Sequence, residues 1–276
     1  MQHHLWYMTL DDKLFLAPIK ENPQHVLDIG TGTGIWAIDF GEYCDGLNLL
    51  VLTIISNQTP LSERHWQRSE SYPTRIVCQA LSPQQSQSNN GSVPVNCQFE
   101  VEDVEDEWTY NQRFDLIHGR LLVSCFKDPR HVLEQAFHNL VPGGYLEMQD
   151  ADFPMRAVDN SMEGTALWEW NMCIVDGAAK AGRPWTRVKE YKGWMEEIGF
   201  VDVQEELLRW PVNTWPRDPH LKKLGLWFQH DLLEGLNSTR AVLTRGLGWS
   251  DEKVEVFLVD VRKDIKNRGV HAYAVM

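Results

Sequence analysis

Val26-Leu27-Asp28-Ile29-Gly30-Thr31-Gly32-Thr33-Gly34 is the stretch of the chain that decides the fold. Its first four residues have the composition of a short buried strand, and three glycines follow at alternate positions. The mainly apolar residues 35–40 come next and predict the first turns of a helix. A buried strand, a glycine turn and a helix form the opening half of a βαβ unit, so an α/β fold is expected.

The rest of the first half continues this alternation of strands and helices. Further strands are predicted at 97–101, 114–118 and 145–149. Between the last two, Asp128 and Pro129 begin a helix that continues to residue 140 with apolar residues at helical spacing. This alternation predicts a doubly wound, mostly parallel sheet.

The second half carries tryptophans in mostly helical patterns. The patterns predict one strand, at 201–208, and helices at 165–181, 187–198, 219–236 and 250–266. Trp168 and Trp170 are two residues apart on the first helix, so their side chains point about 200° apart. One is expected in the core. We assign the other, Trp168, to the substrate, because it comes first after a strand's carboxyl end, where α/β proteins bind ligands.

Composition and charge exclude several classes of protein. The chain has 276 residues with 26 Lys and Arg against 39 Asp and Glu, and its net charge of -13 disfavours nucleic acid or an anionic membrane as a partner. The five cysteines are scattered and contain no C-x-x-C pair, so reduced thiols are expected and no metal site is. We see no signal peptide or membrane-spanning run. A cytoplasmic protein is expected, with the nucleus as the alternative.

The glycine turn predicts which ligand is bound. A dinucleotide-binding fingerprint would need glycine at position 35, where the chain has Ile35. The carboxylate of Asp28 would repel a pyrophosphate but attract a sulfonium or an amino group. This favours S-adenosylmethionine, and we assign its binding to Asp28, Gly30, Thr31, Gly32 and Gly34. A merely tight turn is the alternative.

Nine sequence blocks resemble one family of enzymes. They are 27–39, 98–108, 114–120, 142–147, 182–184, 199–203, 214–216, 247–250 and 261–264. Together they resemble the LaeA-like methyltransferases of fungal secondary metabolism, a group of class I S-adenosylmethionine-dependent enzymes, over nearly the whole chain except 45–75. The resemblance implies a seven-stranded, Rossmann-like sheet with an α-helical cap. It also implies a cofactor-binding core at 1–150, and a cap and substrate region with the remaining strands at 151–276.

The class also indicates roles for residues beyond the glycine turn. S-adenosylmethionine enzymes usually place an acid after the third strand, so we assign Asp103 to the adenine amino group and the backbone amide of Val104 beside it. A solvated acidic face is the alternative. His118, at the end of the fourth strand, is the candidate for contact with the cofactor and for a general base.

The chain departs from the family at the second strand and at both ends. An acid that binds the ribose hydroxyls is expected about 20 residues beyond the turn. Residues 49–52 occupy that spacing, and Ala80 stands where the displaced motif would place the acid. The loss of this acid should weaken the binding free energy of the cofactor by about 1.5–3 kcal/mol per hydrogen bond. Residues 45–75 are expected to be an insertion or a gene-model error, the amino end to begin inside a longer segment, and the last strand to be truncated after 271–276.

Two functions remain open. The first is a methyltransferase that acts on an O or N nucleophile of a small molecule, a fungal secondary metabolite. The second is a non-catalytic or weakly catalytic regulator of secondary metabolism, acting through a protein partner of velvet type or another methyltransferase. The intact glycine turn favours the first function, and the missing acid favours the second.

Overall fold

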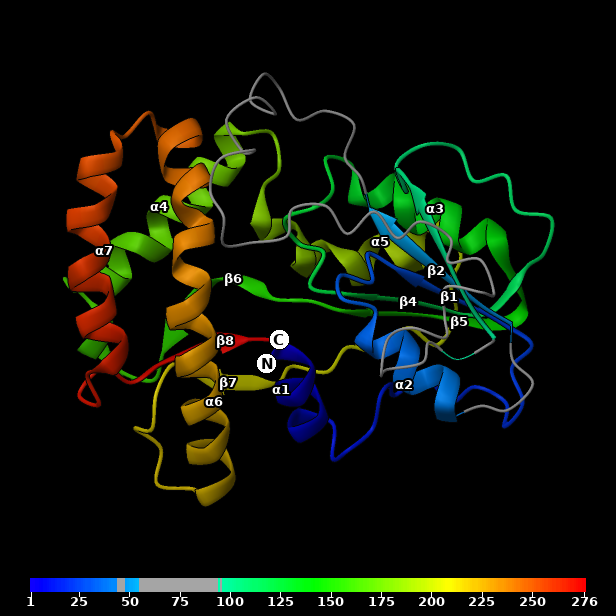
Figure 1. Cartoon of the computed structure of the whole chain (residues 1–276), viewed down its shortest axis with the longest axis horizontal. Helices are drawn as coiled ribbons and strands as arrows, with labels where there is room; N and C mark the ends of the chain where they lie inside the picture. Colours follow the sequence, from blue (N-terminus) through cyan, green and yellow to red (C-terminus); the bar gives the residue numbers. More distant parts are fainter. Residues whose placement is uncertain (44–47, 55–93, 95) are drawn as a thin grey trace, which may run out of the picture. The chain divides into compact units, whose positions relative to one another are not determined.

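The computed structural model describes residues 1–43, 48–54, 94 and 96–276 (Figure 1). These residues form two compact units that interleave along the chain. The glycine-turn unit comprises 17–120 and 134–148, and the helical unit comprises 1–16, 121–133 and 149–276. The regions expected from the sequence were consecutive, at 1–150 and 151–276. In the structure, residues 1–16, 121–133 and 149–150 belong to the helical unit together with 151–276.

The glycine-turn unit contains a five-stranded sheet in the order β3-β2-β1-β4-β5. The pairs β1–β2, β2–β3 and β1–β4 are parallel. The strands are β1 (His25–Ile29), β2 (Asn48–Ile54), β3 (Cys97–Glu102), β4 (Phe114–Arg120) and β5 (Leu140–Gln149). The strand order reverses between β1 and β4, and ligands of doubly wound folds bind at the carboxyl ends of the strands at that point. The predicted parallel α/β sheet is confirmed.

Helix α2 (Ile35–Tyr43) follows the glycine turn directly, and α3 (Pro129–Asn139) precedes β5. Val26, Leu27 and Ile29 of β1 are buried, as are Trp36, Ala37 and Phe40 of α2. Apart from half-buried His25, β1 is therefore a buried central strand, with Asp28 among its apolar residues.

Part of the expected insertion belongs to this sheet. Residues 48–54 form β2, which pairs with both β1 and β3. The remainder of 45–75 lies outside the described residues, and so does Ala80.

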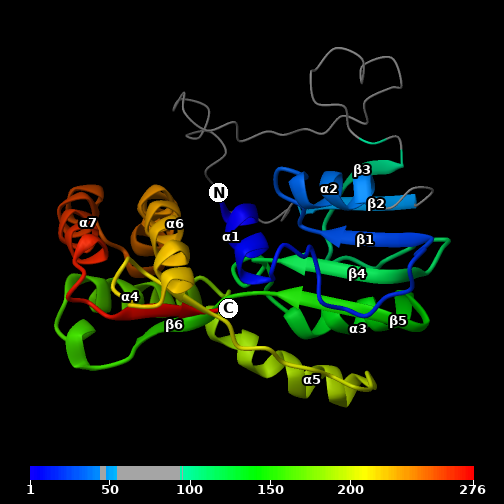
Figure 2. The same cartoon turned by 90° about the horizontal axis from the view of Figure 1, so that it is seen from below.

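The helical unit contains a three-stranded antiparallel sheet in the order β6-β8-β7 (Figure 2). Its strands are β6 (Asp152–Ala157), β7 (Arg209–Pro211) and β8 (Ala272–Val275). Its α-helices are α1 (Gln2–Thr9), α4 (Ala166–Lys180), α5 (Tyr191–Ile198), α6 (Pro219–Gly235) and α7 (Asp251–Lys266). The 3-10 helices are at Asn160–Met162, Trp185–Glu190 and Leu236–Thr239, and a π-helical turn is at Val242–Gly246.

The predicted bounds of α4, α6 and α7 are confirmed within one residue at each end. Their N-terminal caps are side chains next to the helix in sequence, so they could be recognised from the sequence. Thr165, Asp218 and Ser250 accept hydrogen bonds from the backbone in the first turns of α4, α6 and α7. The helix predicted at 187–198 is a 3-10 helix followed by α5, which ends at Ile198 and is capped by Gly199 with φ +118°. None of the helices in the described part of the chain is both long and apolar enough to cross a bilayer.

The strand predicted at 201–208 is wrong. Its apolar residues Val201 and Leu207 are largely exposed, and backbone pairing begins only at Leu208, which exchanges hydrogen bonds with Met276. The edge on which it would pair is β8, which is four residues long. An alternating pattern without a neighbouring strand forms no ladder.

One sheet of seven strands was expected, whereas the described residues form eight strands in two sheets of five and three. The strand expected to be truncated is β8, and it pairs with β6 on one side and β7 on the other. Ala272, Ala274 and Val275 are all buried there. The small residues of this short strand therefore fill the position between both neighbours.

The core of the helical unit is built around aromatic side chains. Trp210 of β7 packs edge-on against Trp6 of α1 and Phe228 of α6, with ring centroids 5.1 and 5.3 Å apart. Its indole nitrogen donates to Thr9 Oγ1 at 2.7 Å. Chain segments about 200 residues apart are thereby held together.

Candidate functional site

The candidate site centres on two side chains that face each other across β1 and β4. Asp28 and His118 are direct neighbours in the register of the two strands. His118 Nδ1 lies 2.8 Å from Asp28 Oδ1, and both side chains are buried. The sequence placed each residue in the site separately, and the structure brings them into contact.

Trp36 completes this pair from the first turn of α2. Its ring stacks on the imidazole of His118, with centroids 3.8 Å apart and planes inclined by 3°. Sequence reasoning assigned Trp36 only to a helix. Its position two residues after Gly34 was the available signal, because the helix that follows a glycine turn packs over the ends of β1 and β4.

Three buried polar atoms around this pair have no hydrogen-bond partner in the described part of the chain. They are Asp28 Oδ2, Thr31 Oγ1 and His118 Nε2. Leaving a buried donor or acceptor unsatisfied costs about 1–3 kcal/mol. A site that gathers three such atoms is suited to a polar ligand that supplies the missing partners.

The glycines shape the turn in two different ways. Gly32 has φ +58°, and a Cβ built there would meet nothing within 4 Å, so the turn is open on that side. Gly34 has φ +78°, and a Cβ would lie 2.8 Å from Cε1 of Phe99 on β3. Gly34 therefore permits close packing against the sheet, whereas the space at Gly32 is left for something other than protein.

Asp103 and Val104 lie in the turn that follows β3. Asp103 Oδ1 accepts from the backbone N–H of Glu105 at 3.0 Å. Val104 is buried, and its carbonyl accepts from Trp108 Nε1 and Gln135 Nε2. The acidic segment is thus an ordered turn, held by α3 through Gln135.

The residues present fit S-adenosylmethionine on the evidence of the unpartnered atoms. Asp28 Oδ2 can accept from a cationic donor, and the open backbone at Gly32 lets a ligand approach closely. The acid expected for the ribose is absent from β2, whose sequence is NLLVLTI. The fit therefore rests on the residues around the glycine turn, and the loss of the ribose acid stays a prediction.

Trp168 and Trp170 separate as their helical spacing predicts. Trp170 is 2% exposed and donates to Thr239 Oγ1 at 3.2 Å, whereas Trp168 is 39% exposed. Trp168 lines a hollow of about 590 Å³ within the helical unit, together with residues 157–160, Met162 and Glu163. Its contact with a substrate stays a prediction.

A second acid in the chain escaped sequence reasoning. Asp150 follows β5 directly and accepts from the backbone N–H groups of Leu122, Val123 and Ala151. Burial raises the pKa of its carboxyl to about 7, although these three hydrogen bonds act in the opposite direction. No motif marks this residue, because only the fold brings 121–123 to it.

The structure also locates three of the five cysteines. Cys97, Cys125 and Cys173 form no disulfide within the described residues, and burial raises the pKa of the Cys97 thiol to about 11. Within the described residues, no group of three or more His, Cys, Asp or Glu is arranged to hold a metal ion. Cys44 and Cys78 lie outside those residues.

A parallel sheet with this strand order and a G-x-G-x-G turn after β1 defines a class I methyltransferase fold. The family model described as "Methyltransferase domain" matches residues 1–205. The chain belongs to this methyltransferase family, and S-adenosylmethionine is its cofactor.

Known fungal proteins are similar along almost the whole chain. The probable methyltransferase tdiE of Emericella nidulans is 32% identical over 99% of this chain and 77% of its own length. Methyltransferase pytC of Aspergillus terreus is 31% identical over 99% and 75%. The secondary metabolism regulator LAE1 of Cochliobolus heterostrophus is 30% identical over 98% and 81%. The predicted membership of the LaeA-like group is confirmed.

Among solved structures, phosphoethanolamine N-methyltransferase 2 of Haemonchus contortus matches with a TM-score of 0.49 and 14% identity. The match covers 98% of this chain and 51% of that one.

Proposed function

We propose that this chain transfers a methyl group from S-adenosylmethionine to an O or N nucleophile of a small molecule, a fungal secondary metabolite. The observation that carries the proposal is the set of three unpartnered buried atoms beside the open side of Gly32. They lie at the point of the sheet where a cofactor is expected, and they need partners that a polar ligand can supply.

The bound cofactor supplies a methyl group on a sulfonium, and the acceptor must be held in line with it at about 3–3.5 Å. We assign to Asp28 the capture of a donor group of the cofactor, and to Asp103 and the Val104 amide the adenine edge. Thr31 and the three glycines shape the turn around the cofactor. These assignments rest on the positions of the residues in one compact unit.

For His118 we propose a positioning role in place of the general base. A base must come within hydrogen-bond reach of the substrate's proton. The side chain of His118 is fully buried and covered by Trp36. It holds Asp28 by one carboxyl oxygen, which leaves the other oxygen directed to the ligand.

The regulator function remains the second candidate. The relative LAE1 is named as a regulator of secondary metabolism, and one laeA relative is named as a protein-methionine methyltransferase. The absence of an acid from β2 supports weak catalysis or none. In this case the chain acts through a protein partner of velvet type or another methyltransferase, in the cytoplasm or the nucleus.

Calorimetric titration with S-adenosylhomocysteine tests the proposal, with Gly32→Ala and Gly143→Ala as a matched pair. Both glycines have positive φ and open space at the Cβ position. Each variant should therefore lose about 1–2 kcal/mol of unfolding free energy from backbone strain. Only Gly32→Ala should also lose cofactor affinity, by at least about tenfold, because only its Cβ would face the ligand.

Two outcomes contradict the proposal. If the parent chain shows no saturable binding, the cofactor role fails and the regulator function is favoured. If Gly32→Ala binds as tightly as Gly143→Ala, the turn is structural and the cofactor site lies elsewhere.

A further inference from the structure

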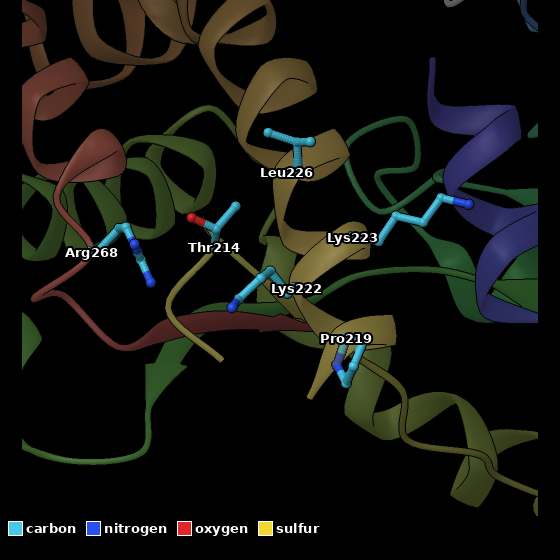
Figure 3. A pocket seen from close by; sticks show the side chains of 6 residues that line it. All are labelled: Thr214, Pro219, Lys222, Lys223, Leu226 and Arg268. Atoms are coloured by element: carbon cyan, nitrogen blue, oxygen red, sulfur yellow. The ribbon is translucent and has the colours of Figure 1, made fainter. Parts of the chain in front are cut away.

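A second hollow of about 420 Å³ lies in the helical unit, formed entirely by residues of that unit (Figure 3). It is bounded by the loop between β7 and α6, the first turns of α6, and the turn between α7 and β8. Its lining residues are Thr214, Pro219, Lys222, Lys223, Leu226 and Arg268. None of these residues belongs to the glycine-turn site.

Three cationic side chains line this hollow, namely Lys222, Lys223 and Arg268. Figure 3 shows Lys222 and Arg268 extending toward one another, with Thr214 between them, whereas Lys223 extends to the other side of α6. None of these three cations has an ion-pair partner in the described part of the chain.

In a chain with a net charge of -13, the convergence of Lys222 and Arg268 without an ion-pair partner among the described residues leaves a local positive potential. The acid nearest in sequence is Asp218. Its Oδ1 accepts from the backbone N–H of Leu221 as the N-cap of α6. This hydrogen bond holds Asp218 at the start of the helix but leaves its negative charge in place, so Lys222 and Arg268 exceed it by one positive charge.

The backbone around the hollow is held by Asn213, whose side chain is fully buried. Its Nδ2 donates to the carbonyls of Asn267 and Val270 at 3.1 and 3.3 Å, and its Oδ1 accepts from Trp215 N–H at 3.0 Å. These bonds tie the loop that carries Thr214 to the turn that carries Arg268.

Helix α6 is fixed against the same residue by close packing. A Cβ on Gly225 would lie 2.2 Å from the carbonyl oxygen of Asn213, so only glycine permits this approach. Lys222 is therefore presented by an element that cannot move freely relative to Thr214. Cations on a fixed frame bind anions with less loss of conformational freedom than cations on mobile loops.

We propose that this hollow binds a small polyvalent anion that carries phosphate groups. The guanidinium of Arg268 and the ammonium of Lys222 contact the charged oxygens, and the hydroxyl of Thr214 donates to a third. Pro219 and Leu226 contact an apolar part of the same molecule. Nucleic acid is disfavoured, because the rest of this acidic chain repels an extended polyanion.

Calorimetric titration of the full chain with inorganic pyrophosphate in low salt tests the proposal. Parent protein should bind saturably, and Arg268→Gln and Lys222→Gln should each weaken binding by about tenfold or more, since each removes a charge-assisted contact. The matched control Lys192→Gln removes an exposed cation from α5 and should stay within about twofold of the parent. All three positions are exposed, so urea unfolding midpoints should coincide.

A second ligand, citrate, and a variant of the cofactor site, Gly32→Ala, serve as further controls. Citrate should bind more weakly than pyrophosphate if the hollow selects phosphate, and equal binding would overturn that selectivity. No saturable binding by the parent, or equal losses in Lys192→Gln, would overturn the site itself. Gly32→Ala should bind pyrophosphate like the parent, so failure here is separable from failure of the cofactor site.

Discussion

The two units of the chain treat their buried polar groups differently. In the helical unit, Asn171 exchanges hydrogen bonds with both backbone groups of Met155, and Asn213 and Thr239 are also fully engaged. In the glycine-turn unit, Asp28, Thr31 and His118 each keep one buried atom without a partner in the described residues. The polar side chains of Asn171, Asn213 and Thr239 are paired within the chain itself. The unpartnered atoms of the glycine-turn unit are left for a ligand to bind.

The largest expected effect is on the helical unit. Trp170→Ala removes a fully buried ring and its bond to Thr239, and should lower the unfolding free energy by about 3–5 kcal/mol. Urea denaturation followed by tryptophan fluorescence measures the loss. The control Trp168→Ala, at a half-exposed position, should cost less than about 1 kcal/mol. Equal losses would show that the two side chains do not divide between core and surface.

A smaller effect is expected at the Asp28–His118 pair. His118→Leu leaves a buried carboxyl group without its hydrogen bond, and should cost about 3 kcal/mol of unfolding free energy without ligand. Adding Asp28→Asn in the same chain should recover part of that loss. A double-mutant cycle by chemical denaturation gives the coupling, expected at about 1–3 kcal/mol. Strictly additive losses would mean that the pair is not coupled.

The local part of the fold was predictable from the sequence, and the non-local part was not. The caps Thr165, Asp218 and Ser250 and the β1 turn act over a few residues, so their elements were located within a residue or two. The strand at 201–208 failed because a ladder depends on a partner far along the chain. The division of the strands into two sheets depends on the same distant pairings.

The candidate site divides in the same way. Asp28, Gly32 and His118 were found from motifs, but their contacts were not. The stacking of Trp36 on His118 and the hydrogen bonds of Asp150 join residues that lie about 30 to 90 positions apart. The departure from the family pattern at 49–52 could be read from the sequence, and the loss of the ribose acid stays a prediction.

The smallest expected effect concerns pH. Burial raises the pKa of Asp150 to about 7, above its usual value of 3.8, so the folded state binds this proton more tightly than the unfolded state. This contribution to stability is complete below pH 4 and is lost as the pH rises through about 7. Between pH 5 and 7, the parent should lose about 2 kcal/mol relative to Asp150→Asn.

Urea denaturation at several pH values measures this difference, and parallel pH profiles for the two proteins would contradict it. The result sharpens the comparison between the units. All the hydrogen bonds of Asp150 are made within the helical unit, so its pH response comes from burial and not from a missing partner.

The position of β8 has a consequence for how the protein is made. β6 and β7 do not pair with each other, and each reaches its neighbour only through residues 272–275. A ribosome synthesises the chain from its amino end, so β1 to β5 emerge long before that strand. A nascent chain halted before residue 272 would hold the glycine turn in place while β6 and β7 still exposed open edges. The helical unit would therefore be the last part of the nascent chain to fold, and it would be exposed to chaperones and proteases for the longest time.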